Sequence, residues 1–311
     1  MRHALGRALV LGSMFMFAAC GPAGRNDGHG GGGGGADGNN LGGIEGTPDT
    51  CMDGVDNDGN GVTDCADPKC SGIGSCPVCG MVEHPAGTPV DLPDGLCGTN
   101  DDGICSCVTD ADCASLLPSG QHCFTIDSTS KECRQSYTSG VTFTGFGPTQ
   151  TMQQPSDIVS VCVNMSHEWV RDLQVSLLSP SGQRIVLSKF EGRDNVTEYY
   201  LGHPLNTDGD CAACTQEMGF DYCWTPTATN MPILEYINNG GTTQTWNSAS
   251  VVPGGDYQAS DPWTVLNGAM LNGKWTLEVT DLWPLDAGKI HSWTIAFNPM
   301  IVQDCSGPII Q

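Results

Sequence analysis

The clearest alternation of hydrophobic and polar positions lies in residues 172–188, DLQVSLLSPSGQRIVLS. Leu173, Val175 and Leu177 occupy every second position, and the alternation resumes at Ile185 after the turn sequence PSG. A period of two is typical of a β-strand with one buried face, and Pro-Ser-Gly favours a tight turn. We therefore predict an antiparallel hairpin in this segment.

The same pattern returns in residues 271–297, LNGKWTLEVTDLWPLDAGKIHSWTIAF. Trp275 and Trp293 alternate with aliphatic residues on either side of the turn sequence DAG, so we expect both in a hydrophobic core rather than on a sugar-stacking surface. Together the two segments predict a mostly β fold, with an antiparallel sandwich in the C-terminal half of the chain.

The hairpin DL…L.SPSG and the ending NGKWTLEVTD…DAGKIHSWTIAF resemble the P domain (P/Homo B) of proprotein convertases and secreted bacterial proteases. The resemblance covers residues 140–299. It implies a jelly-roll-type β-sandwich, which in that family is usually attached to a subtilisin-like catalytic domain that it stabilises.

A subtilisin-type arrangement of Asp, His and Ser is not recognisable in the sequence. The histidines before Gly140 lack the HGT context, and no GTS turn occurs. An S-x-x-K match at residues 128–131 lacks its partner motifs, and His167-Glu168 lacks the second histidine of a zinc-protease helix. We find no catalytic triad and predict that the chain is not itself a protease.

The first twenty residues predict a bacterial lipoprotein signal. Arg2 and Arg7 precede a short apolar stretch, and FAAC places small residues before Cys20. We expect a signal peptide at 1–19, lipidation of Cys20 and a disordered, Gly-rich tether at 20–46, which together would anchor the protein in the outer membrane or at the cell surface. An ordinary cleaved signal with an incidental cysteine is the alternative.

The chain has 17 cysteines and a formal net charge of −23. Subtracting a lipidated Cys20 leaves an even number of cysteines, as expected for disulfides in an exported protein. The four cysteines of the predicted sandwich can pair internally, and Cys305 then has to reach back to the N-terminal cysteines. The acidity argues against nucleic acid and anionic lipid head groups as partners.

Oxygen-bearing side chains are concentrated in residues 51–70, CMDGVDNDGNGVTDCADPKC. Their short spacing, with glycines between them, allows several to face one cation, and hard oxygen ligands suit Ca²⁺. The candidate ligands are Asp56, Asp58, Asn60, Asp64 and Asp67. No glutamate stands at the twelfth position, so the segment is not an EF-hand. The alternative is a disulfide-stapled acidic loop that holds no ion.

This segment resembles thrombospondin type 3 calcium repeats and, more closely, the motif C.DG.DND.DG..DC.D..C of surface lipoproteins of myxobacteria. That motif is also described as MopE-like and copper-binding. Sulfur and imidazole ligands favour copper, and Met52 is the only Met or His in the block, so we expect Ca²⁺ instead.

Two further cysteine patterns follow. CPVC at 76–79 has redox or zinc-knuckle spacing, but no second C-x-x-C lies at ribbon distance, so structural disulfides are expected. Residues 96–134 resemble small cysteine-rich repeats of exported myxobacterial proteins and are too few to bury a sufficient core without bridges. Their six cysteines, which can form three bridges, are Cys97, Cys105, Cys107, Cys113, Cys123 and Cys133. Asp110 and Asp112 are candidates for binding a cation, but we favour a solvated turn.

Inside the predicted sandwich, Asp172 and Asp281 stand where the P-domain pattern has Asp. Each is a candidate ligand for a structural Ca²⁺, and Asp281 is equally a candidate turn cap. We expect His167 and His291 to be surface or packing residues.

The long insertion at residues 202–255 is the candidate recognition surface. Trp224, Trp246 and Trp263 lie in its region, and we expect them to be exposed. Nearby cysteines would hold this region in shape.

The expected domain order after the tether is an Asp/Cys-rich motif at 47–80, a Cys-rich module at 81–137, the sandwich at 138–300 and a tail at 301–311. Two functions remain open. The favoured one is a surface-tethered, calcium-stabilised binding or structural protein. The other is a component that stabilises or targets a separate subtilisin-like serine endopeptidase, its protein partner.

Overall fold

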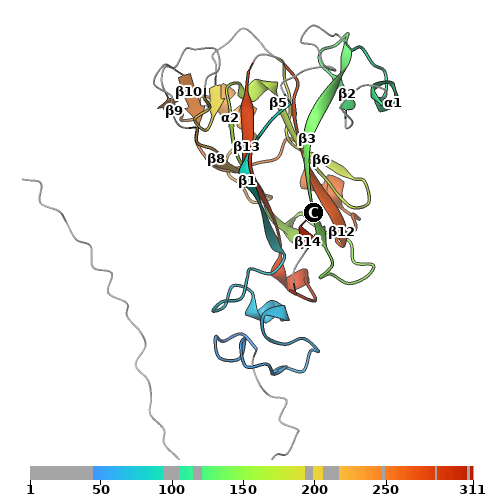
Figure 1. Cartoon of the computed structure of the whole chain (residues 1–311), viewed down its shortest axis with the longest axis vertical. Helices are drawn as coiled ribbons and strands as arrows, with labels where there is room; N and C mark the ends of the chain where they lie inside the picture. The colour runs from blue at the N-terminus through green and yellow to red at the C-terminus, as the bar shows by residue number, and fades with distance from the viewer. Residues whose placement is uncertain are drawn as a thin grey trace, which may run out of the picture. The chain divides into compact units, whose positions relative to one another are not determined.

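The computed structural model describes residues 45–93, 105–114, 121–192, 199–205, 217–246, 249–283, 286–306 and 309–310. Strands dominate this part of the chain, and two sheets face each other across one hydrophobic core (Figure 1). The predicted mostly β sandwich is confirmed. No helix in these ranges is long and apolar enough to cross a membrane. The predicted signal peptide, Cys20 and nearly all of the tether lie outside the described residues.

The first sheet contains eight strands among the described residues. In spatial order its main path is β1 (Met81–Asp91), β13 (Gly288–Phe297), β4 (Ile158–His167), β7 (Tyr199–Leu201), β10 (Ala249–Val252) and β9 (Gln244–Trp246). Beside this path, β8 (Phe220–Trp224) pairs with β4, and β11 (Gly255–Tyr257) pairs with β8. The β10–β7 and β11–β8 pairs are parallel, whereas the other pairs are antiparallel.

The second sheet is antiparallel and contains six described strands. Its order is β14 (Ile309–Ile310), β3 (Lys131–Phe143), β12 (Gly273–Asp281), β5 (Leu173–Leu178) and β6 (Arg184–Ser188), with β2 (Gln121–Thr125) paired to the start of β3. The predicted hairpin is β5–β6, and Leu277 of β12 lies opposite Leu177 of β5.

The core between the sheets is built from the alternating residues that the sequence indicates. Trp275 is fully buried and Trp293 is 1% exposed, which confirms the core assignment of both. The indole Nε1 of Trp293, on β13, donates to Ser139 Oγ on β3 at 2.9 Å. This bond gives the buried indole an acceptor and joins the two sheets.

Helices are short and few in the described residues. The α-helices are α1 (Asp110–Cys113) and α2 (Ile233–Asn238), and α2 buries Ile233, Leu234 and Ile237. The 3₁₀ helices are η1 (Asp64–Ala66), η2 (Pro68–Cys70), η3 (Pro155–Asp157), η4 (Val170–Asp172), η5 (Trp263–Leu266) and η6 (Pro299–Ile301).

The boundaries of the sandwich differ from the predicted boundary at residues 137/138. Strand β1, assigned to the Cys-rich module, pairs with β13 in the first sheet. Strand β3 crosses residue 137 without a break, pairing with β2 in its first part and with β12 in its second. The structural reason is that one long strand serves both the cysteine-rich hairpin and the sandwich.

The disulfides tie these parts together. The pairs with both cysteines in the described residues are Cys51–Cys70, Cys65–Cys76, Cys79–Cys305, Cys107–Cys123, Cys113–Cys133 and Cys162–Cys223. Cys305 reaches back to the N-terminal group, as predicted. The two cysteines of CPVC belong to different bridges, which confirms their structural role. Cys105 is also disulfide-bonded, and Cys97, Cys211 and Cys214 lie outside the described residues.

Candidate functional site

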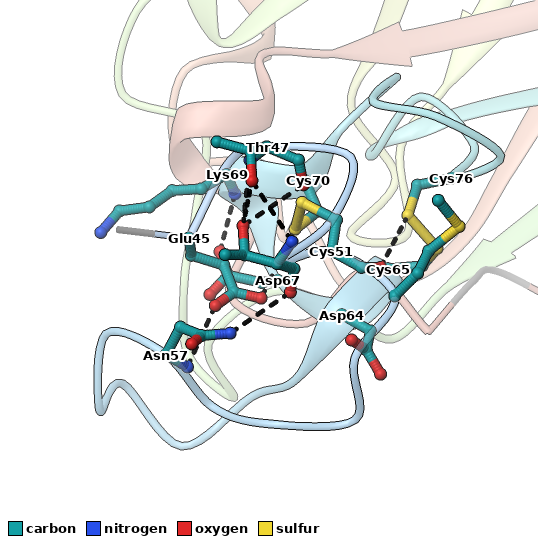
Figure 2. The surroundings of a disulfide bond; sticks show 12 residues. Glu45, Thr47, Cys51, Asn57, Asp64, Cys65, Asp67, Lys69, Cys70 and Cys76 are labelled. Atoms are coloured by element: carbon teal, nitrogen blue, oxygen red, sulfur yellow. Dashed lines mark hydrogen bonds between the residues drawn. A yellow bond between two sulfur atoms is a disulfide. The ribbon is translucent and has the colours of Figure 1, made fainter. Parts of the chain in front are cut away.

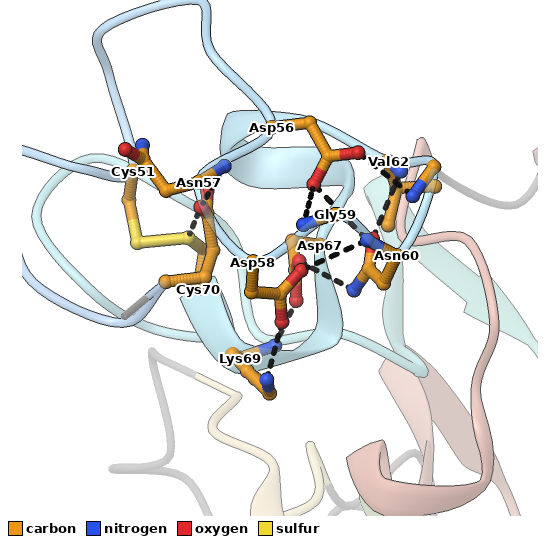
Figure 3. A network of polar contacts seen from close by, with 12 residues as sticks. Cys51, Asp56, Asn57, Asp58, Gly59, Asn60, Val62, Asp67, Lys69 and Cys70 are labelled. Carbon is orange, nitrogen blue, oxygen red and sulfur yellow. Dashed lines mark hydrogen bonds and ion pairs between the residues drawn. A yellow bond between two sulfur atoms is a disulfide. The ribbon is translucent and has the colours of Figure 1, made fainter. Parts of the chain in front are cut away.

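The Asp-rich loop is shaped by hydrogen bonds from backbone N–H groups to its own side chains (Figure 3). Asp56 Oδ1 accepts from Gly59 N and Asn60 N at 2.7 and 3.2 Å, and Asp56 Oδ2 accepts from Gly61 N at 2.9 Å. Gly59 and Gly61 have φ values of 77° and 96°, which glycine adopts without a steric penalty. The sequence DNDGNG therefore forms a tightly bent loop around the Asp56 carboxylate.

Asp67 connects this loop to the helix that follows. Its side chain is fully buried; Oδ1 accepts from Lys69 N at 2.7 Å and so caps η2, while Oδ2 accepts from Asn60 Nδ2 at 2.7 Å. Asp64 faces a different neighbour, because both of its carboxylate oxygens accept from Gly54 N, at 3.0 and 3.1 Å. The structure thus joins Asn60 to Asp67 and places Asp64 elsewhere.

Lys69 supplies a positive charge to the acidic loop. Its ammonium forms an ion pair with Asp58 Oδ2, which sequence reasoning did not identify. The hydrogen bond to Asp58 raises the pKa of Lys69, and the negative charges of Asp58, Asp67 and Glu45 act in the same direction. In return, the bond from Lys69 lowers the pKa of Asp58.

Glu45 belongs to the same cluster, although sequence analysis placed it in the tether (Figure 2). The residue is 2% exposed, and its Oε2 accepts from Asn57 N at 3.1 Å. Its Oε1 lies 3.6 Å from Cys70 Sγ, which is bonded to Cys51. A disulfide sulfur carries no hydrogen to donate. Among the described residues, Glu45 Oε1 is therefore a buried carboxylate oxygen with no hydrogen-bond donor, a costly arrangement.

The chemistry of this cluster suits a hard cation, whereas its present spacing does not enclose one. Carboxylate and amide oxygens are the ligands that Ca²⁺ prefers, and Glu45 Oε1 needs a partner. However, no three of the carboxylates in the described ranges have oxygens within 4.8 Å of one another. Two groups in the described ranges do meet this distance, and both contain disulfide sulfurs. They are Glu45 with Cys51 and Cys70, and Cys107 with Cys113 and Cys133. A bound cation would have to draw the carboxylates together.

The acidic cluster, which consists of Glu45 and the polar side chains of residues 56–69, is joined to the segment around Cys305. Besides the Cys79–Cys305 bridge, Cys305 N donates to Ala66 O at 2.8 Å and Phe297 N donates to Gly80 O at 2.7 Å. These contacts join the loop to Cys305 and join Gly80, which follows the loop, to the end of β13.

The other predicted carboxylates lie at the ends of sandwich strands. Asp281 is fully buried; its Oδ2 lies 3.1 Å from His167 Nε2, and its Oδ1 accepts from Trp283 N at 3.0 Å. Asp281 therefore caps a turn through its side chain. Asp172 is also fully buried in η4, and its carbonyl accepts from Leu282 N at 2.8 Å. His167 is a packing residue with no exposed surface.

A serine and a histidine do meet in the described part of the chain, on β4 and β13. Ser166 Oγ lies 3.4 Å from His291 Nε2, but it donates to Glu217 Oε1 at 2.6 Å. Ser166 is fully buried. Burial lowers the pKa of His291, while the charge of Glu217 raises it and that of Lys289 lowers it. Because the hydroxyl is directed to a carboxylate and is closed to solvent, this geometry does not prepare a nucleophile.

The expectation that the insertion tryptophans are exposed is wrong for two of them. Trp224 is fully buried on β8 and Trp263 is 7% exposed in η5. Trp246 is partly exposed and stacks on His203 with ring centroids 3.8 Å apart. The alternation of Phe220, Tyr222 and Trp224 along the chain is the signal that could have identified a strand with one buried face.

Comparison with protein families bears directly on the sandwich. Residues 156–208 and 240–297 match the family described as the proprotein convertase P-domain. This match confirms the resemblance of the sandwich to the P domain that the sequence motifs indicated. The two matched stretches cover β4 to β7 and β9 to β13, while the acidic cluster and the cysteine-rich hairpin fall outside them.

Two solved structures are similar to this chain at 13% sequence identity. One is the serine protease of Aeromonas sobria in complex with the chaperone, with 71% of this chain and 28% of that chain covered and a TM-score of 0.22. The other is the Aeromonas sobria serine protease, with 71% and 27% covered and a TM-score of 0.20. The chain thus spans less than a third of the length of either protease. Comparison with curated proteins gave no match.

Proposed function

We propose that this chain is a non-catalytic P-domain protein of the bacterial cell envelope, anchored through a lipidated Cys20 and stabilised by Ca²⁺. Its P-domain serves as a binding or structural module at the outer membrane or cell surface. The observation that carries the proposal is the covalent joining of the P-domain to an acidic cluster through Cys79–Cys305. Because the bridge joins the segment that follows the acidic loop to the end of the sandwich, ion binding in the loop would act on the domain that the tether presents.

The proposed calcium site consists of loop side chains together with Glu45. Asp56, Asp58, Asn60, Asp64 and Asp67 supply oxygen ligands, and buried Glu45 adds an oxygen that has no donor in the described residues. A bound Ca²⁺ would supply positive charge that offsets carboxylate repulsion. Asp172 and Asp281 are the candidates for a second, structural calcium site in the sandwich.

Two experiments test anchoring and the lack of catalysis. Expression in a lipoprotein-processing bacterium followed by membrane fractionation should place the protein in the envelope, and Cys20→Ser should release it. Recovery of the unsubstituted protein in a detergent-free soluble fraction would refute anchoring. Purified protein should not hydrolyse casein; hydrolysis abolished by a serine-reactive inhibitor would refute the non-catalytic proposal.

The second candidate function is the stabilisation or targeting of a separate subtilisin-like serine endopeptidase. It is favoured by the match to the family described as the proprotein convertase P-domain. Affinity purification from envelope extracts distinguishes the two functions. Recovery of a serine endopeptidase that loses thermal stability without the chain would support this alternative, whereas recovery of no protease would leave the display function.

A further inference from the structure

Several asparagines of this chain are followed directly by glycine. They are Asn60, Asn239, Asn267 and Asn272. In such a pair the backbone nitrogen of the glycine can attack the side-chain carbon of the asparagine, because glycine has no side chain to block the approach. The attacking nitrogen must lose its proton during the reaction. The group that accepts the hydrogen bond from this nitrogen therefore decides which pair is activated.

The glycine that follows Asn60 donates its N–H to a carboxylate. Gly61 N lies 2.9 Å from Asp56 Oδ2, and a carboxylate can take up a proton as a general base. On the other side of the reacting bond, Asn60 Oδ1 accepts from Val62 N at 2.9 Å. That N–H would stabilise the negative charge that develops on Oδ1 during attack. Asn60 and Gly61 are both exposed, so water reaches them.

The other pairs lack this arrangement. Gly240 N donates to Ile237 O at 3.0 Å, and Gly268 N donates to Met152 O at 2.7 Å. A backbone carbonyl accepts a hydrogen bond but does not remove the proton. Asn272 is held through its side chain, because its Nδ2 donates to two backbone carbonyls at 2.9 and 3.1 Å. The chain thus contains its own reference sites for the reaction at Asn60.

We propose that Asn60 is a self-modification site, at which the folded Asp-rich loop promotes conversion of the side-chain amide to a carboxylate. Asp56 takes the proton from Gly61 N, this nitrogen forms a bond to Asn60 Cγ, and the Cγ–Nδ2 bond breaks. The leaving nitrogen receives the proton from Asp56 and departs as ammonia, which leaves a five-membered succinimide ring. Water then opens the ring to an aspartyl or isoaspartyl residue at position 60.

The conversion changes the loop at its link to η2. Asn60 Nδ2 donates to Asp67 Oδ2 at 2.7 Å, and Asp67 is fully buried. The new carboxylate has no hydrogen to donate and repels the charge of Asp67. The modified loop therefore carries one more negative charge and is held less firmly to η2. The reaction needs no metal ion, so it is independent of the calcium proposal above.

Peptide mapping by mass spectrometry tests the proposal on the oxidised full chain, incubated at neutral pH with a chelator. Conversion at Asn60 should be faster than at Asn239, Asn267 and Asn272. It should also be faster than conversion at Asn60 in the same chain after reduction and unfolding in denaturant. The unfolded chain gives the rate that the Asn-Gly sequence has without the folded loop.

Two variants test the role of Asp56. Asp56→Asn keeps an oxygen acceptor but no longer takes up a proton, so it should slow conversion at Asn60 by about a hundredfold, the lower end of what a positioned general base contributes. Asp64→Asn is the control. It removes a carboxylate of the same loop that accepts from Gly54 N instead, and it should leave the rate at Asn60 unchanged.

Equal rates at Asn60 in the folded and the unfolded chain would refute the proposal. A folded Asp56→Asn variant that converts as fast as the unsubstituted chain would refute the role of Asp56 as the base. The comparison of folded with unfolded chain involves no substitution, so it decides the proposal even if Asp56→Asn does not fold. All rates are measured without free Ca²⁺, and none of these results bears on calcium binding.

Discussion

The imidazole Nε2 of His167 lies 3.1 Å from Asp281 Oδ2, and neither side chain reaches solvent. His167 ends β4 in the first sheet, and Asp281 ends β12 in the second. Because His167 Nδ1 accepts from Trp169 N at 3.0 Å, the ring proton lies on Nε2 and is donated to Asp281. This pair is therefore a buried hydrogen-bonded clasp between the two sheets.

Asp281→Ala should destabilise the sandwich because it removes the acceptor for two donors, His167 Nε2–H and Trp283 N–H. We expect a loss in unfolding free energy of about 1–3 kcal/mol for each donor that stays buried. Chemical denaturation measures it. Asp221→Ala, at an exposed aspartate, is the control and should cost less than about 0.5 kcal/mol. Equal effects of the two variants would contradict the clasp.

Tyr222→Phe should destabilise the first sheet through a single hydroxyl. The buried Tyr222 Oη accepts from Gly202 N and donates to Val252 O, both at 2.8 Å, and burial raises the pKa of this phenol. Its removal leaves two backbone groups unpaired, so we expect a loss of about 1–3 kcal/mol by chemical denaturation.

Tyr236→Phe is the matched control for that experiment. Tyr236 Oη donates to Thr242 O at 3.0 Å in an exposed setting, where water can replace the hydroxyl. We expect a change below about 0.5 kcal/mol. A Tyr222→Phe effect no larger than this control would show that the buried hydroxyl does not hold the insertion to the sheet.

The Cys79–Cys305 bridge should stabilise the chain more than Cys65–Cys76 does. The two bridges span 226 and 11 residues. Restriction of the unfolded chain predicts losses of about 5 and about 3 kcal/mol when each is replaced by a pair of alanines. Urea unfolding of the two double variants measures the difference. A larger loss from the short bridge would refute the view that the long one closes the P-domain.

Acid should open the turn between β2 and β3 through Asp127. Its Oδ1 accepts from Thr129 N, Thr129 Oγ1 and Ser130 N at 2.7–2.8 Å, and these bonds lower the pKa of Asp127 to about 2. The pKa of an aspartate in an unfolded chain is about 3.9. The stabilisation by the ionised Asp127 is therefore fully present above that pH and is lost as the pH falls through about 2. Carboxyl NMR titration should find this low midpoint.

Asp127→Asn provides the control for the pH dependence. It keeps an oxygen acceptor for Thr129 and Ser130 but does not titrate. Amide exchange at Ser130 should therefore lose its dependence on pH between about 4 and 2 beyond the intrinsic rate change. A midpoint for Asp127 near about 4 would mean that the turn does not favour the ionised carboxylate.

Local patterns predicted those parts of the fold that depend on neighbouring residues. The alternation at Leu173, Val175 and Leu177 gave the hairpin β5–β6 because strand periodicity is visible within a few residues. The even number of cysteines left after Cys20 correctly predicted that Cys305 pairs with a cysteine of the N-terminal group. It could not identify that partner as Cys79.

Contacts between distant segments could not be predicted in this way. No local signal pairs β1 with β13, because the register joins residues such as Met81 and Ala296 that are far apart in the chain. Glu45 follows a glycine-rich sequence without periodicity, so only the folded chain reveals its place against the Cys51–Cys70 bridge. The Asp spacing gave no indication that Lys69 pairs with Asp58.

Thermal unfolding of the oxidised full chain, titrated with Ca²⁺ and separately with Cu²⁺, tests the central claim most directly. A linked site predicts a midpoint that rises with Ca²⁺, by an amount corresponding to about 2.7 kcal/mol at one hundred times the dissociation constant. The rise should be reversed by a chelator, absent with Cu²⁺ and lost in Asp56→Ala/Asp58→Ala. An unfolding midpoint that does not change with Ca²⁺, or that rises equally in the double variant, would contradict the proposal that Ca²⁺ stabilises this protein.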